Sequence, residues 1–203
     1  MSVAESADGP TRFNARMALA RRNALLLAAT QAIAGSASPI SISLGGLAGF
    51  YLLGADKSLA TAPVTGFNIG VAAGALPAAW LMRQVGRRYG FMTGAASLAL
   101  GGLIAAIALF RSDFILFIVG LVIIGMGAAF TQQYRFAAAD GAPTSFKASA
   151  ISWVLAGGVF AAIIGPQTVI YTRELFAPVS FAGSFLAILP LAALAILILA
   201  FLK

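Results

Sequence analysis

The side chains that could recognise a ligand are neutral hydrogen-bonding groups within two long apolar stretches. They are Gln31, Ser36, Ser38, Ser41 and Asn68. Amide and hydroxyl groups both donate and accept hydrogen bonds. Such a set suits a solute with amides, hydroxyls or a heteroaromatic ring better than a simple ion. Pro39, among the serines, predicts a bend or local unwinding of its helix. The serines could instead bond the carbonyls of their own helix.

The residue types in the chain exclude most kinds of catalytic and metal-binding site. The 203-residue chain has no histidine and no cysteine, which removes disulfides, thiol catalysis and the usual zinc or haem ligands. Intramembrane enzymes need a nucleophile with its base, a carboxylate pair or a metal, and the serines have no such base at their depth. No charged residue falls clearly in the middle of an apolar stretch, where charges mark ion pathways. We therefore expect no enzyme, no metal site and no cofactor.

The elements that must position these side chains are membrane-spanning helices. The chain is 61% hydrophobic and 9% charged, whereas about a quarter of the residues in a soluble protein are charged. A hydrocarbon core of roughly 30 Å needs about 20 apolar residues per helix. Six stretches reach this length, at residues 23–53, 59–82, 90–110, 114–134, 148–171 and 180–202. We expect an all-α membrane protein, with a basic tail over 1–22 and a six-helix domain over 23–203.

The positive charges predict the orientation of these helices. The net charge is +7, and ten of the 13 lysines and arginines lie in the tail, in the gaps after the second and fourth stretches, and at the C-terminus. The other three are Lys57, Arg111 and Arg173. Because positive residues favour cytoplasmic loops, both termini are predicted in the cytoplasm of a bacterial-type inner membrane. The basic excess favours contact with anionic lipids, and we expect no nucleic-acid partner.

Glycine spacing and a weak internal symmetry predict how the helices pack. Glycines four residues apart let helix backbones approach closely, and this spacing occurs at Gly45/Gly49, Gly70/Gly74 and Gly90/Gly94. An Ala-Asp pair precedes both the second and the fifth stretch, and each stretch contains a glycine followed by a proline near its end. These two stretches run in opposite directions. The pattern favours two inverted three-helix repeats, as in many transporters.

The loop after the second stretch carries a recognisable motif. Residues 81–90 read Leu-Met-Arg-Gln-Val-Gly-Arg-Arg-Tyr-Gly. Gly86, Arg87 and Arg88 resemble the second half of the Gly-x-x-x-Asp-Arg-x-Gly-Arg-Arg/Lys loop of the major facilitator superfamily (MFS). Arg83 stands where that family has an aspartate that helps to hold the cytoplasmic gate closed. The acidic residue of the inner loops, Asp140, is our hypothetical substitute, or else a solvated loop charge.

Two further features resemble this family. The Gly125–Ala129 run resembles the glycine-rich end of a second family motif, with Leu121 at the position of its arginine. The Gly-Pro pair of the fifth stretch resembles a motif of the family's exporters. Arg135 ends a polar cluster at a position where family members more often gate the cavity, although it could snorkel to lipid head groups. The expected gating residues are Gly86, Arg87, Arg88, Arg135, Asp140, Gly165 and Pro166.

The resemblance implies a fold of twelve helices in two halves, of which this chain resembles the N-terminal one. It implies secondary active transport of a small organic solute by alternating access. The expected partners are the solute, membrane lipids and a second six-helix half, which would carry the proton-binding carboxylate if transport is proton-driven. Two alternatives remain open. The chain could be a half-transporter that pairs with itself, or a membrane assembly or scaffold protein that transports nothing.

Overall fold

The computed structural model describes residues 10–54 and 57–202, and within these ranges all regular structure is helical. The helices are α1 (Pro10–Ala34), α2 (Ala37–Leu52), α3 (Ala62–Phe110), α4 (Phe114–Thr131), α5 (Tyr134–Asp140), α6 (Lys147–Thr172), α7 (Ala182–Leu186) and α8 (Ile188–Leu199). Taken with their short interruptions, they form five helical segments that are long and apolar enough to cross a membrane. This confirms the expected all-α membrane fold.

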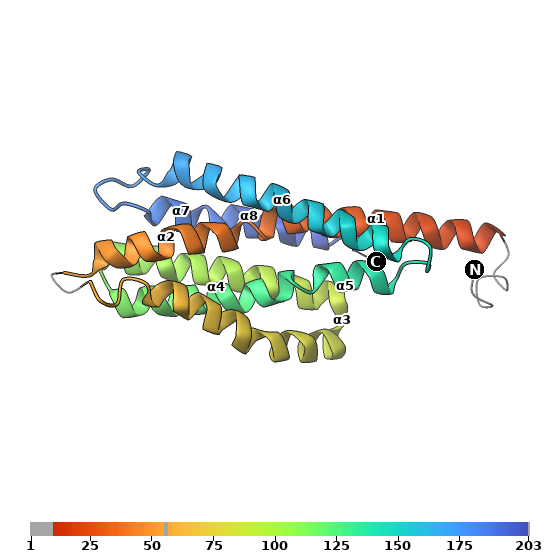
Figure 1. Cartoon of the computed structure of the whole chain (residues 1–203), viewed down its shortest axis with the longest axis horizontal. Helices are drawn as coiled ribbons and strands as arrows, with labels where there is room; N and C mark the ends of the chain where they lie inside the picture. The colour runs from red at the N-terminus through yellow and green to blue at the C-terminus, as the bar shows by residue number, and fades with distance from the viewer. Residues whose placement is uncertain (1–9, 55–56, 203) are drawn as a thin grey trace.

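The longest of these segments, α3, is two antiparallel arms joined at Gly86. A straight helix of 49 residues would extend roughly 74 Å, far beyond a bilayer core of about 30 Å. Gly86 breaks the helix with φ 83° and ψ 165°, a conformation that is open essentially only to glycine. The chain reverses there, and the arms over 62–85 and 87–110 run in opposite directions (Figure 1).

Shorter interruptions divide the other segments. Gly35 and Ser36 separate α1 from α2, one turn before Pro39, where the sequence predicts a bend. Gln132 and Gln133 separate α4 from α5. The first helix begins at Pro10, so the basic residues from 12 to 22 extend α1, and residues 1–9 of the expected tail lie outside the described residues.

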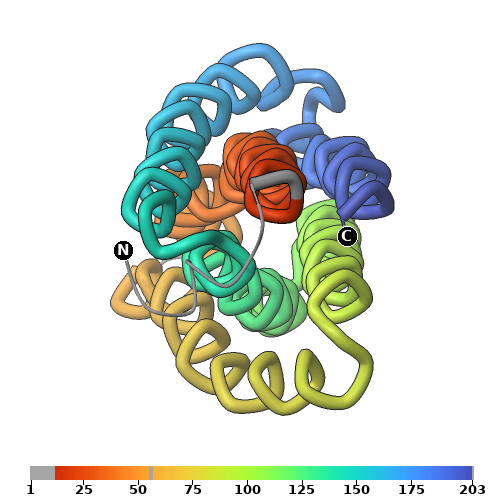
Figure 2. The backbone as a smooth tube through the Cα atoms, turned by 90° about the vertical axis from the view of Figure 1, so that its right-hand side faces the viewer, coloured from red at the N-terminus to blue at the C-terminus, as the bar shows by residue number. Residues whose placement is uncertain are grey.

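The helices form one bundle with two distinct ends. Figure 1 places the start of α1, the reversal of α3, the connection from α5 to α6 and the end of α8 at one end. The connections from α2 to α3 and from α6 to α7 lie at the other end. The end-on view in Figure 2 shows α1 between α6 and α8, and both arms of α3 flanking α4.

Small residues occupy the helix contacts, while large apolar side chains point outward. Gly74 and Gly101 pack against α4 so closely that an added Cβ would lie 2.8 Å from the Met126 Cα and 2.6 Å from the Ile124 nitrogen. Gly70 and Gly49 also meet backbone atoms of neighbouring segments. These contacts confirm the packing role predicted from glycine spacing. Large exposed side chains cover the outside, among them Leu76, Val159, Phe160 and Ile163.

Candidate functional site

A cavity of about 420 Å³, mainly apolar but with five polar side chains in its lining, lies between α1 and α2, the first arm of α3, α4 and α6. Three of the five predicted binding residues line it, Gln31, Ser38 and Asn68. Two more polar residues join them from the end of α4, Thr131 and Gln132. The fold therefore brings side chains that are up to 101 positions apart into one wall of amides and hydroxyls.

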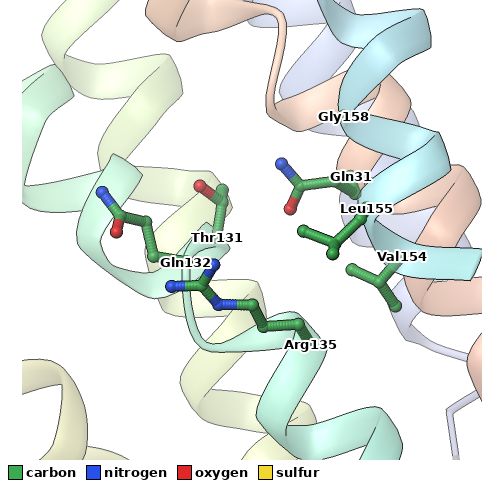
Figure 3. A pocket seen from close by; sticks show the side chains of 7 residues that line it. All are labelled: Gln31, Thr131, Gln132, Arg135, Val154, Leu155 and Gly158. Atoms are coloured by element: carbon green, nitrogen blue, oxygen red, sulfur yellow. The ribbon is translucent and has the colours of Figure 1, made fainter. Parts of the chain in front are cut away.

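A second cavity of about 190 Å³ adjoins the first and shares Gln31, Thr131, Gln132 and Gly158 with it. It adds Arg135 together with the apolar side chains of Val154 and Leu155 on α6. Figure 3 shows the Arg135 guanidinium directed toward Thr131 and Gln132, with Gln31 on the opposite side of the space. The shared lining residues show that the two cavities are neighbours.

The hydrogen bonds of the lining residues leave acceptor groups available. The Asn68 Nδ2 donates to the Val64 carbonyl at 2.9 Å, so one of its two N–H donors is engaged within its own helix. The Thr131 hydroxyl likewise donates to the Ala128 carbonyl at 2.8 Å. Because an amide oxygen and a hydroxyl oxygen each keep acceptor capacity in such arrangements, both residues can still accept a hydrogen bond. Thr131 also ends α4, where the helix breaks.

Ser36 and Ser41, two predicted binding residues, lie in the protein core and line neither cavity. The Ser36 hydroxyl donates to the Ile33 carbonyl, which is the local bonding that serines often adopt in helices. The Ser41 hydroxyl is buried without a hydrogen-bond partner among the described residues. They belong to the same interrupted segment as Gln31 and Ser38, but they face the core.

Arg135, which the sequence predicts to be a gating residue, lines the smaller cavity together with the predicted binding residue Gln31. It belongs to the first turn of α5, and its guanidinium carbon lies 4.9 Å from the ring centroid of Phe136. The residue is partly exposed, while its Nε is buried and has no hydrogen-bond partner among the described residues. None of the described residues that line the two cavities is acidic.

Four of the other predicted gating residues lie at the end of the bundle where α3 reverses, namely Gly86, Arg87, Arg88 and Asp140. Asp140 forms an ion pair with Arg87, and Arg87 also donates to the Ala137 carbonyl at 3.2 Å. The two paired side chains are 45% and 61% exposed. They line a separate cavity of about 310 Å³ with Gln133. Arg88 is exposed, with its guanidinium 5.7 Å from the Tyr89 ring centroid.

The two residues of the Gly-Pro pair in α6 lie in different environments, one buried and one exposed. Gly165 is buried against α2, where an added Cβ would lie 2.6 Å from the Pro39 Cγ and 3.1 Å from the Ser36 carbonyl oxygen. Pro166 is exposed. Gly165 thus joins α6 to the interrupted segment beside the larger cavity.

The fold and the site define a multi-pass helical membrane protein with a partly exposed cavity that holds several polar side chains, and comparison with known proteins gives the family. No family model matches the chain. It is 51% identical over 180 residues to "Riboflavin transporter RfnT" of Brucella anthropi, covering 88% of this chain and 45% of that protein. It is also 33% identical over 153 residues to "Uncharacterized MFS-type transporter YdeG" of Bacillus subtilis, covering 74% of this chain and 35% of that protein.

These similarities show that the chain belongs to the MFS-type transporters, as the loop motif predicts. A third relative, "Uncharacterized MFS-type transporter YddS" of Bacillus subtilis, is 29% identical over 162 residues, with 80% of this chain and 36% of that protein covered. The chain spans less than half the length of each of these curated relatives and matches their N-terminal part.

Proposed function

We propose that the chain is the N-terminal six-helix half of a secondary transporter that moves riboflavin, or a closely similar flavin, across a bacterial inner membrane. The observation that carries this proposal is the 51% identity to a riboflavin transporter across 88% of the chain. Transport would proceed by alternating access, in which two halves rock about a site near the middle of the membrane.

The chemistry of the larger cavity supports a flavin as the solute. Riboflavin combines a heteroaromatic ring, an amide-like edge and a chain of hydroxyl groups, and it carries no charge. The cavity offers amides from Gln31, Asn68 and Gln132 and hydroxyls from Ser38 and Thr131. Binding sites for neutral solutes are typically apolar walls with a few placed polar groups. The apolar remainder of the lining includes Phe67, Ile42 and Val71.

The proposal includes six spans, obtained when the two arms of α3 are counted separately, arranged as two inverted three-helix repeats. It places both termini in the cytoplasm, because the bundle end with the start of α1 and the reversal of α3 carries most of the basic residues. The second half, either another chain or another part of a longer polypeptide, would face the larger cavity. Membrane lipids would contact the exposed apolar side chains.

The gate in this proposal is the Arg87–Asp140 ion pair at the cytoplasmic end. The pair joins the reversal of α3, where Gly86 and Arg88 lie, to the end of α5. The family's usual aspartate is absent, and Asp140 occupies a position from which it neutralises the same loop. Gly165 and Pro166 would contribute through the contact of α6 with α2.

Uptake of labelled riboflavin tests the proposal. The intact protein, with any second half that co-purifies with it, is expressed in a bacterium that cannot make or import riboflavin. We expect uptake that saturates with substrate and growth at low external riboflavin, and neither in cells with an empty vector. Absence of both uptake and flavin binding in correctly inserted protein would contradict the proposal.

A labelling experiment separates transport from a scaffold role. The chain has no cysteine, so Ser38→Cys introduces one reactive thiol in the cavity wall. A transporter half predicts that a water-soluble maleimide reaches this thiol. A scaffold that fills the cavity with a partner helix predicts protection from the reagent, and that result would favour the alternative.

A further inference from the structure

Arg135 is a cation at the narrow end of a cavity that is otherwise lined by neutral groups. Its guanidinium is directed toward Thr131 and Gln132 (Figure 3). Its Nε is buried and lacks a hydrogen-bond partner among the described residues. A donor that is buried without a partner loses its hydration and gains nothing in return. Because the Nε itself is covered by protein, the terminal guanidinium nitrogens, directed into the cavity, are the donors that a bound solute can meet.

No carboxylate of the described chain is placed to accept hydrogen bonds from these nitrogens. The described residues lining the two adjoining cavities include no aspartate or glutamate. Asp140, on the same short helix as Arg135, forms its ion pair with Arg87. Stacking over the Phe136 ring at 4.9 Å orients the guanidinium plane but satisfies none of its N–H donors. The acceptor then comes from outside the described residues, either from the second half that would face this cavity or from a bound solute, and the binding experiment below separates the two.

We propose that Arg135 binds the edge of the flavin ring formed by the C4 carbonyl oxygen and N5, an inference that rests on the transport function proposed above. Guanidinium donates hydrogen bonds and accepts none, and its planar fork matches flat pairs of acceptor atoms. The C4 carbonyl oxygen and the adjacent unprotonated ring nitrogen N5 form such a pair of acceptors, whereas the N3–H and the ribityl hydroxyls donate. Val154 and Leu155, beside Arg135, provide apolar contacts for the ring faces.

The opposite end of the cavity suits the rest of the solute. Ser38 and Asn68 line the larger cavity and are absent from the lining around Arg135. Gln31, Thr131 and Gln132 belong to both parts. A flavin with its ring edge at Arg135 therefore directs its hydroxyl chain toward Ser38 and Asn68. Arg135 is thus a residue that sets specificity for the ring, in addition to any part in gating.

The test is flavin binding by the intact protein, purified with any partner chain, and followed by quenching of flavin fluorescence. Riboflavin is compared with lumiflavin, which keeps the ring but has a methyl group in place of the ribityl chain. Arg135→Gln should weaken binding of both ligands by the same factor, roughly 10- to 150-fold, as expected for loss of a hydrogen bond to a charged group. Arg135→Lys keeps the charge without the fork and should fall between wild type and Arg135→Gln.

Arg111→Gln is the matched control, because Arg111 is exposed, caps the end of α3 and lines neither cavity. Its affinities should equal those of wild type. The proposal is wrong if wild type binds riboflavin and Arg135→Gln leaves both affinities unchanged. It is also wrong if only riboflavin is affected, since Arg135 would then contact the ribityl chain.

Flavin mononucleotide supplies the remaining comparison, because it adds a phosphate to the end of the chain. Tighter binding of this ligand than of riboflavin by wild type, lost selectively in Arg135→Gln, would make Arg135 a phosphate site and overturn the proposal. Wild-type protein that binds none of the three flavins would refute the transport function itself. If Arg135→Gln folds poorly, the test rests on Arg135→Lys, provided that its unfolding temperature equals that of wild type.

Discussion

Replacing Asp140 with asparagine removes the carboxylate that pairs with Arg87 while preserving the shape of the side chain. The two side chains are 45% and 61% exposed, so solvent screens their attraction. Exposed pairs of this kind contribute about 0.2–1 kcal/mol. The substitution should therefore raise the population in which α5 separates from the reversal of α3 by a factor of roughly 1.4–5.

Arg87→Ala should have a larger effect than Asp140→Asn. Arg87 has a second acceptor, the Ala137 carbonyl at 3.2 Å, which the asparagine variant leaves in place. A hydrogen bond of this kind adds about 0.5–1.5 kcal/mol to the ion pair. The expected order of opening is wild type, then Asp140→Asn, then Arg87→Ala.

The rate at which maleimide labels an Ala79→Cys thiol measures this opening. Ala79 lines the same cavity as Arg87 and Asp140, and the chain offers no other thiol. Measurements in inside-out vesicles should show the difference between wild type and Asp140→Asn shrinking as salt approaches 1 M, where the Debye length is about 3 Å. An Asp140→Asn rate equal to or above that of Arg87→Ala, or a salt-independent difference, would refute this account of the pair.

Three other substitutions test the packing and the cavity. Gly165→Val should lower the unfolding temperature in detergent, by an amount matching about 1–3 kcal/mol, because its Cβ would lie 2.6 Å from the Pro39 Cγ. The control Gly46→Ala should leave the unfolding temperature unchanged, because a Cβ at Gly46 would have no atom within 4 Å. Ser41→Ala should not lower the unfolding temperature and should leave riboflavin uptake unchanged, because the hydroxyl is buried without a partner. A clear decrease in the unfolding temperature or in uptake would show that the hydroxyl makes a contact. Asn68→Ala should raise the KM for riboflavin about 3- to 10-fold, as expected for one neutral hydrogen bond, and an unchanged KM would remove Asn68 from the site.

The sequence predicts the elements of this fold well, because apolar length and glycine spacing act locally. Glycines four apart, such as Gly70 and Gly74, are placed at helix contacts, as expected. The interruption before Pro39 also follows from local chemistry, since proline cannot continue the hydrogen-bond ladder behind it. The start of α1 at Pro10 was not foreseen, because the polar residues that follow it resemble a tail rather than a helix.

The direction in which each polar side chain faces could not be predicted in the same way. The direction of a side chain depends on its angular position around the helix axis. The break at Gly35 and Ser36 changes that angular position for the residues that follow, by an amount that the sequence pattern does not reveal. Gln31 before the break and Ser38 after it both line the cavity, whereas Ser41, which follows Ser38 on the same helix, is buried in the core. The break after Thr131 has the same effect on Arg135, which reaches the cavity from a helix that begins afresh.

The glycine contacts between α3 and α4 limit which substitutions this sequence can accept during evolution. At Gly74 and Gly101 even a methyl group would collide with the neighbouring backbone, so neither position admits a neutral change. On the outward side, Leu76 is exposed and any large apolar residue would serve. Mutational tolerance should thus depend on side-chain volume at inward positions, which reject larger residues, and on polarity at outward positions, which accept exchange among apolar residues. A saturation library scored by growth on riboflavin would map this gradient along each helix.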